Sequence, residues 1–233
     1  MEIDPVRAVL GRLEASADPS RLPGMARYGI ATDRALGVSI PDLRRTARDI
    51  GTDHDLALRL WQTGVHEARM LAGMVDEPSR VTAAQMDAWV GDFDSWDLCD
   101  QVCSNLFDRT RFAFRKAEQW SRRKPEFEKR AAFALMASMA VHRKDLGDEP
   151  FQAFLPLIRA SATDERNYVK KAVNWALRQI GKRNVRLNRL AIATAEEIRE
   201  IDSSAARWIA SDALRELTSP AVRQRLGSGA RRG

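Results

Sequence analysis

The sequence has 233 residues, of which 44% are hydrophobic and 30% charged, and its formal net charge is +6. A chain of this length can bury a substantial core, so it fits one large domain or an array of small repeats. The longest strongly apolar run, Ala131 to Val141, is too short to span a bilayer, and the acidic N-terminus lacks the basic and apolar regions of a signal peptide. We therefore expect a cytoplasmic protein that has no membrane partner.

The charge is unevenly distributed along the chain. Residues 1–100 carry 11 Lys or Arg against 17 Asp or Glu, whereas residues 101–233 carry 27 against 15. A basic half of this size favours a polyanionic partner, and nucleic acid is the first candidate. A merely soluble basic protein is the alternative.

Almost every segment has the apolar period of a helix, and no run alternates as a half-buried strand does. In chain order, the predicted helices cover residues 4–16, 20–28, 40–50, 54–63, 65–75, 81–91, 95–107, 111–121, 125–141, 149–160, 165–181, 184–200, 202–216 and 218–226. Because the connections are short, consecutive helices should form antiparallel pairs. The sequence therefore predicts an all-α protein.

The helix pairs recur about every 30–45 residues without strong sequence identity. This recurrence is typical of a degenerate helical-repeat solenoid, in which successive helices build one concave surface. A compact helical bundle is the alternative, but no single helix is long or apolar enough to be its centre. We expect one repeat domain over residues 1–226 and a flexible basic tail over residues 227–233.

The potential metal ligands are few and scattered. Cys99 and Cys103 lie one turn apart on an apolar stripe, and the three histidines are His54, His66 and His142. Zinc sites combine such residues in closely spaced pairs, and the sequence has no Cys-x-x-Cys motif. We expect both cysteines to be core residues, and we expect no metal or other cofactor.

Trp96 and Asp100 form the most informative pair in the sequence. They lie four residues apart at the start of the helix predicted over residues 95–107, so both occupy one face, and Asp94 or Ser95 can cap this helix. The apolar stripe of the helix points about 90–130° away. An indole beside a carboxylate could bind a cation or stabilise positive charge that develops on a sugar. A half-buried Trp beside a solvated Asp is the purely structural alternative.

The segment from residue 166 to residue 184 places a second Trp among cations. Its core face has helical spacing and comprises Val169, Ala172, Val173, Ala176, Leu177 and Ile180. A row that points away from this face comprises Lys171, Trp175, Arg178 and Lys182. Beyond Gly181, which ends the helix, the basic surface continues with Arg183, Arg186 and Arg189. Trp175 either packs against a neighbouring repeat or touches a ligand, and cations around an aromatic ring suit a phosphate backbone.

Arg130 is the third candidate. It lies in a helix that is apolar over much of its circumference, and the neighbours in its direction are mostly small. A guanidinium in such surroundings needs an anion, either a carboxylate such as Asp100 or a bound phosphate. The alternative is an Arg at the helix start whose side chain simply reaches water.

Together these segments resemble the AlkD family of DNA alkylation repair glycosylases, which are built from HEAT-like helical repeats. The resemblance covers most of the chain and rests on Tyr28–Ile30, Leu36–Arg44, Asp94–Asp100, Phe127–Phe133 and Val169–Arg178. It implies an all-α HEAT-like solenoid whose concave basic surface faces DNA. The family's site residues correspond to Trp96, Asp100, Arg130 and Trp175, and a family tyrosine corresponds more loosely to Tyr28. The residues that follow Tyr28, Gly29 to Thr32, depart from the polar pattern of the family.

The resemblance implies a monofunctional DNA glycosylase that excises cationic N3- or N7-alkylated purines in base excision repair and leaves an abasic site. Asp100 would stabilise positive charge on the deoxyribose and orient the attacking water. Trp96 and Trp175 would pack against the sugar and the cationic nucleotide, and Arg130 would hold a flanking phosphate.

The resemblance and the basic face together identify the expected partner as double-stranded DNA with alkylated bases. DNA-binding residues are expected to be Tyr28, Lys171, Arg178, Lys182, Arg183 and Arg186. We expect a monomer that associates with the nucleoid.

Two other functions remain open. A helical-repeat protein could bind branched or damaged DNA without excision, and it would show salt-sensitive binding but no base release. A protein-interaction scaffold would show little affinity for DNA at moderate salt, and Trp175 would be buried in a partner or a neighbouring repeat.

Overall fold

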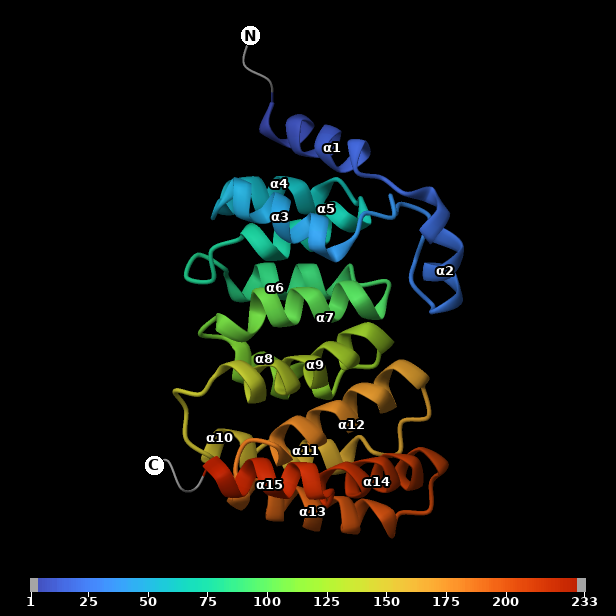
Figure 1. The fold of residues 1–233 in the computed structure, drawn as a ribbon, viewed down its shortest axis with the longest axis vertical. Coiled ribbons are helices and arrows are strands. Elements are labelled where there is room, and N and C mark those ends of the chain that lie inside the picture. The colour runs from blue at the N-terminus through green and yellow to red at the C-terminus, as the bar shows by residue number, and fades with distance from the viewer. Residues whose placement is uncertain (1–3, 230–233) are drawn as a thin grey trace. The chain divides into compact units, whose positions relative to one another are not determined.

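The computed structural model describes residues 4–229, and the regular secondary structure of these residues is entirely helical. The all-α class that the sequence predicts is therefore confirmed. The chain divides into two compact units, Met1–Thr110 and Arg111–Gly233 (Figure 1). That residues 1–226 act as one repeat domain stays a prediction. Among the described residues, no helix combines the length and the apolar character needed to cross a membrane.

Unit 1 is built around α5. Its elements are α1 (Pro5–Ala15), η1 (Pro19–Arg21), α2 (Leu22–Arg27), α3 (Ile40–Ile50), α4 (His54–Gln62), α5 (His66–Val75), α6 (Ala83–Gly91), α7 (Trp96–Asn105) and η2 (Phe107–Arg109). Helices α3, α4 and α7 all pack against α5. The core includes Leu43, Leu60 and Leu71, which are fully buried, and Trp61 stacks on Trp89 with 4.0 Å between ring centroids.

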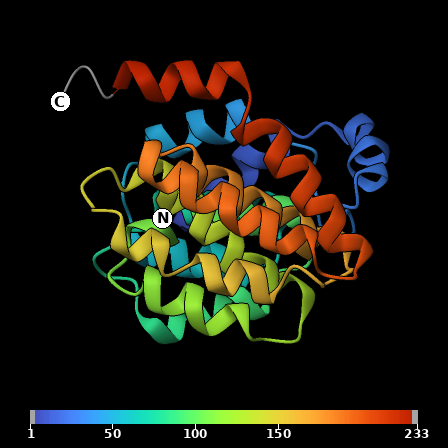
Figure 2. The ribbon, with the colours of Figure 1, turned by 90° about the horizontal axis from the view of Figure 1, so that it is seen from below.

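Unit 2 is centred on the packing of α9 against α12. Its elements are α8 (Ala113–Ser121), α9 (Glu126–His142), α10 (Glu149–Gln152), α11 (Leu155–Ala160), α12 (Asn167–Gly181), α13 (Val185–Arg199), α14 (Ser204–Leu217) and α15 (Pro220–Gly229). Helix α8 pairs with α9, and α13 pairs with α14. Figure 2 shows α12, α13 and α14 side by side, and each of them contacts the other two.

Proline divides two of the predicted helices. The helix expected over residues 20–28 consists of η1 followed by α2, and the one expected over residues 149–160 consists of α10 followed by α11. Pro23 and Pro156 lie in the first turns of α2 and α11. Because proline has no backbone N–H, neither residue can donate the hydrogen bond that would continue the preceding helix.

The C-terminal boundary also differs from the expectation. Helix α15 extends to Gly229, so residues 227–229, which we expected in a flexible tail, continue this helix. Helix α15 packs against α14, and its Val222 and Leu226, which lie within the predicted range, are buried. Residues 230–233 of the predicted tail lie outside the described residues.

Candidate functional site

Helix α7 separates its core side from the face that carries the predicted site. The apolar side is fully buried and comprises Leu98, Cys99, Val102 and Cys103. The core position predicted for both cysteines is confirmed, and burial raises the pKa of the Cys103 thiol well above its usual range. Trp96 and Asp100 are half-buried on the other side of the helix. Among residues 4–229, no group of three or more His, Cys, Asp or Glu side chains could hold a metal ion.

Tyr28 and Trp96 meet although they are 68 residues apart in sequence. Tyr28 directly follows α2 and is one of the exposed large hydrophobic residues, with a relative exposure of 72%. The Trp96 indole Nε1–H donates a hydrogen bond to the Tyr28 carbonyl oxygen, at 2.9 Å. Tyr28, Trp96 and Asp100 thus lie along one side of unit 1, which we call the Trp96 face. This bond orients the indole through the backbone of α2 and leaves the phenol of Tyr28 in solvent.

A buried ion pair lies behind the Trp96 face. The Nε2 atom of His66, in the first turn of α5, is 2.9 Å from Asp97 Oδ2, and the Ser95 hydroxyl donates to Asp97 Oδ1 at 2.8 Å. Ser95 is the N-cap residue of α7, as expected, but its hydroxyl contacts this carboxylate and does not cap a backbone N–H of the helix. The side chains of His66 and Asp97 are only 4% and 13% exposed.

The two partners of this pair shift each other's pKa. Burial disfavours the imidazolium of His66, but the hydrogen bond and charge of Asp97, together with Glu67 and Asp94, outweigh burial and raise the His66 pKa. Burial also disfavours ionisation of Asp97, but the hydrogen bonds from His66 and Ser95 outweigh it and lower the Asp97 pKa. Both shifts favour an imidazolium paired with a carboxylate.

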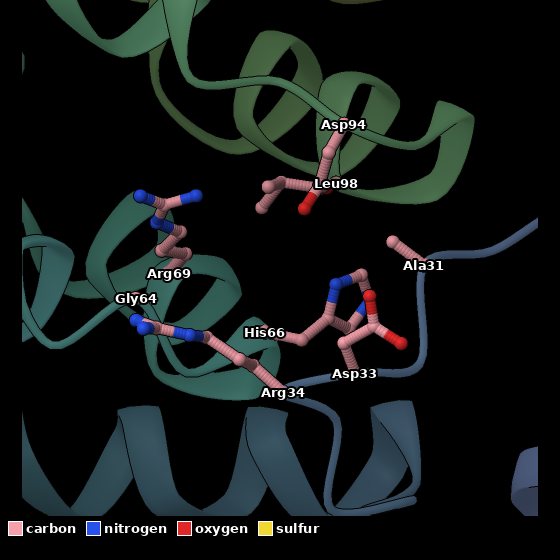
Figure 3. A pocket seen from close by; sticks show the side chains of 8 residues that line it. All are labelled: Ala31, Asp33, Arg34, Gly64, His66, Arg69, Asp94 and Leu98. Atoms are coloured by element: carbon pink, nitrogen blue, oxygen red, sulfur yellow. The ribbon is translucent and has the colours of Figure 1, made fainter.

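His66 borders a pocket of about 320 Å³ in unit 1 (Figure 3). The pocket is lined by Ala31, Asp33, Arg34, Gly64, His66, Arg69, Asp94 and Leu98. Figure 3 shows the side chains of Asp94 and Leu98 pointing into it from the α7 side, opposite the His66 ring. The guanidinium of Arg69 is engaged by the Trp61 and Asp92 carbonyl oxygens. Of the residues that line the pocket, Asp33 and Asp94 are acidic, whereas Arg34, Arg69 and His66 are basic. The pocket therefore contains basic and acidic groups in comparable numbers.

In unit 2, the Arg130 side chain is fixed against the start of α12. Arg130 is only 6% exposed, and its Nη1 donates a 2.7 Å hydrogen bond to the carbonyl oxygen of Tyr168. The structural alternative, an arginine that simply reaches water, is thereby wrong. The carbonyl at least partly meets the need of the guanidinium for an acceptor, so burial of Arg130 does not by itself require a phosphate.

Helix α12 has the core face predicted from its spacing. All six predicted core residues are fully buried, from Val169 to Ile180. Trp175 is half-buried and Lys171 is exposed, so both point away from the core of unit 2. This face of the helix is therefore accessible at Lys171 and partly accessible at Trp175.

Acidic side chains of α14 bind the C-terminal half of the predicted basic row. Glu216 accepts hydrogen bonds of 2.6 Å from both Arg178 Nη1 and Lys182 Nζ, and Asp212 lies 3.4 Å from Arg178. Periodicity within α12 indicates which side chains point away from the core, but it does not show that residues of a later helix bind them. Contact of Arg178 and Lys182 with DNA stays a prediction, and it must compete with these ion pairs.

Arg183 and Arg186 have different surroundings. The Arg183 guanidinium donates to the carbonyl oxygens of Ala140, Arg143 and Leu146, at 2.9, 3.1 and 3.0 Å, and lies 3.8 Å from the centroid of the Phe151 ring. It therefore binds the end of α9 and the following loop. Arg186 is exposed, and its closest carboxylate, that of Glu149, is 3.6 Å away.

The four predicted catalytic residues divide equally between the units. Trp96 and Asp100 belong to unit 1, whereas Arg130 and Trp175 belong to unit 2. That all four act in one site stays a prediction. Sequence reasoning missed the pairing of His66 with Asp97, because no local pattern connects two residues that are 31 positions apart.

Comparison with known proteins adds a family and a fold. The model of a family described as DNA alkylation repair enzyme matches residues 9–217. One similar solved structure represents a family described as related to the HEAT-like repeat DNA glycosylases, with affinity for branched DNA structures. That structure covers 95% of this chain and 96% of its own, with a TM-score of 0.77 and 20% sequence identity. This likeness confirms the HEAT-like fold. None of the curated proteins matches the sequence.

Proposed function

Because the chain belongs to the DNA alkylation repair enzyme family, whose model matches residues 9–217, we propose that it is a DNA glycosylase. Its proposed substrates are cationic N3- or N7-alkylated purines in duplex DNA, and its product is an abasic site. The observation that carries the proposal is the Trp96 face, where a half-buried carboxylate and an indole occupy one side of α7.

The chemistry of the substrate explains why so few groups suffice. Alkylation at N3 or N7 makes the purine a cationic leaving group, so a strong general acid is not needed. As the glycosidic bond breaks, positive charge develops on the deoxyribose, and a carboxylate next to the sugar stabilises that charge and orients water. In this proposal Asp100 supplies the carboxylate, and Trp96 packs against the cationic nucleotide.

Unit 2 supplies the proposed contacts with the DNA backbone. Arg130, held by the Tyr168 carbonyl oxygen, would bind a flanking phosphate, and Trp175 would pack against the sugar. Lys171 and Arg186 are exposed and would contact backbone phosphates. No lysine is assigned as a covalent nucleophile, so strand cleavage is not expected.

The proposal is tested by base release from methylated duplex DNA. We expect the wild-type protein to release 3-methyladenine or 7-methylguanine, and we expect Asp100→Asn to slow release by about 10²-fold or more, the usual effect of removing a group that stabilises transition-state charge. Asp55→Asn, which removes an exposed carboxylate on α4, is the control and should keep the wild-type rate. Unchanged release by Asp100→Asn would exclude the assigned role.

The structural neighbour favours a second candidate function, which is binding of branched DNA without excision. In that case the wild-type protein would release no base, and it would bind a four-way junction more tightly than a duplex of the same length. The same preparations therefore separate the two candidates when junction binding is measured beside base release.

A further inference from the structure

The first turn of α5 holds the loop that follows Tyr28. The buried Glu67 carboxylate accepts backbone N–H groups of Leu36, Gly37 and Val38, at 2.9, 2.7 and 3.2 Å. The neighbouring His66 N–H donates to the Arg34 carbonyl oxygen at 3.0 Å. Four backbone groups of residues 34–38 are thus bound by two adjacent residues of one helix. Because these bonds are largely buried, the loop has little freedom to move relative to α5.

The same turn of α5 also holds the first turn of α7. The His66 ring is bonded to Asp97, and Asp97 is bonded to Ser95, so the residues on both sides of Trp96 are tied to α5. Trp96 in turn donates to the Tyr28 carbonyl oxygen. These contacts close a ring that runs from α5 through the loop to Tyr28, across to Trp96, and back through Asp97 to His66.

We propose that His66 is a positioning residue that fixes the Trp96 face through Asp97, and that loss of its proton loosens this face. The catalytic consequence of this proposal rests on the proposed function, but its structural consequence does not. The His66 side chain is only 4% exposed and would act through Asp97 without touching DNA.

The hydrogen bonds identify the nitrogen that titrates. Asp97 accepts bonds at both carboxylate oxygens and its pKa is lowered, so it is ionised and His66 Nε2 must be the donor. The proton gained or lost is therefore the one on Nδ1. The His66 ring borders the pocket of Figure 3, which gives solvent a route to it.

The charged groups that surround His66 come from four elements. They are Asp97 of α7 and Asp94 just before it, Glu67 and Arg69 of α5, Asp33 and Arg34 of the loop, and Arg21 of η1. Carboxylates outnumber guanidiniums in this set, and Arg69 is also held by the Asp92 carboxylate at 3.6 Å. The surroundings therefore favour the imidazolium.

The sign of the pH dependence follows from the raised pKa of His66. Stability that depends on the imidazolium is fully present below the ordinary histidine pKa of about 6.5, and it is lost as pH rises through the raised folded-state pKa. Above that pH, neutral His66 still donates from Nε2 to the ionised Asp97, but the bond loses the attraction between opposite charges.

The experiment is an NMR titration that follows the Trp96 indole Nε1–H resonance, assigned with Trp96→Phe. In the wild-type protein we expect this resonance to move in one step above pH 6.5, about the ordinary histidine pKa. His66→Gln can still donate to Asp97 but does not titrate, so the resonance should persist without the step. The matched control is His54→Gln, since His54 is also paired with a buried carboxylate, Asp76 at 2.6 Å; the step should remain in this variant.

Three outcomes would overturn the proposal: no step in the wild-type protein, the same step in His66→Gln, or loss of the step in His54→Gln. If the protein excises bases, the base-release kcat of the wild-type protein should fall through the same pH range, while His66→Gln should show no such fall. Failure of the proposed function would appear as no release by any variant, and the titration would still decide the role of His66.

Discussion

The buried carboxylate of Glu67 is bound by fixed backbone donors. Glu67 is 1% exposed and accepts three backbone N–H groups of the loop after α2. A buried carboxylate is costly unless such donors replace its water, so Glu67 and the loop stabilise each other only in this conformation. The conformation in turn requires Gly37, which has φ +79° and lies against the backbone carbonyl of Asp18.

Gly37→Ala should therefore destabilise unit 1. A Cβ at this position would overlap the Asp18 carbonyl group as well as strain the backbone, and we expect a loss of about 2–4 kcal/mol in the free energy of unfolding. Gly51→Ala is the control, because Gly51 has the same φ of +79° but nothing within 4 Å of its Cβ position. Urea denaturation measures the free energy of unfolding of both variants. Equal losses in the two variants would show that overlap with the Asp18 carbonyl group does not contribute.

At the scale of elements, the start of α12 is bound to α9 by an ion-pair cluster. Asp164 contacts Arg166 at 2.6 Å and Lys129 of α9 at 3.0 Å. The pKa of Asp164 is lowered to about 2, and the hydrogen bond from Arg166 is the largest cause. Burial opposes this shift, whereas the contact with Lys129 adds to it. This cluster lies beside the contact of Arg130 with Tyr168, so it helps to set the position of a predicted site residue.

The depressed pKa gives this cluster a pH signature. Its stabilisation is fully present above the ordinary aspartate pKa near 4 and is lost as pH falls toward about 2. Asp164→Asn should lower the free energy of unfolding by about 1 kcal/mol at pH 7, after solvent screening is considered, and by almost nothing at pH 2. Asp202→Asn, which alters an exposed ion pair with Arg207, should have no measurable effect at either pH. A pH-independent loss in Asp164→Asn would contradict the argument.

At the scale of the whole molecule, net charge overstates the positive charge available to a polyanion. Of the basic row of α12, Arg178 and Lys182 are both bound by Glu216, whereas Lys171 is exposed. Only cations that exchange their counterions for phosphates contribute to the salt dependence of DNA binding. The proposed DNA interface therefore depends on particular cations more than on the total.

This distinction predicts different salt dependence for two lysine variants. Lys171→Ala should weaken binding to duplex DNA whatever its sequence, and it should reduce the slope of log K against log salt concentration by about 0.9. Lys182→Gln should reduce the slope by less than Lys171→Ala does, because the Lys182 ammonium is already bound by Glu216 at 2.6 Å and must leave it to contact a phosphate. Fluorescence anisotropy over a range of salt concentrations measures the DNA affinity of both variants. Equal slopes for Lys171→Ala and the wild-type protein would exclude Lys171 from the interface.

The sequence by itself determined most of the helices, their inward faces and the placement of Trp96 and Asp100 on one side of α7. These properties are local, since backbone geometry fixes which residues share a helix face and apolar residues must then point inward. The same logic located the buried row of α12 and the two core cysteines of α7.

Only the tertiary structure decided which side chains meet across long separations. It paired His66 with Asp97, bonded the Trp96 indole to the Tyr28 carbonyl oxygen, and bound Arg178 to Glu216 of α14. Such pairings depend on how whole helices pack, and many packings are compatible with one pattern of apolar residues. Helical periodicity therefore shows which side chains point away from the core of their own helix pair. The neighbouring helices determine whether such a side chain contacts solvent, a ligand or another side chain.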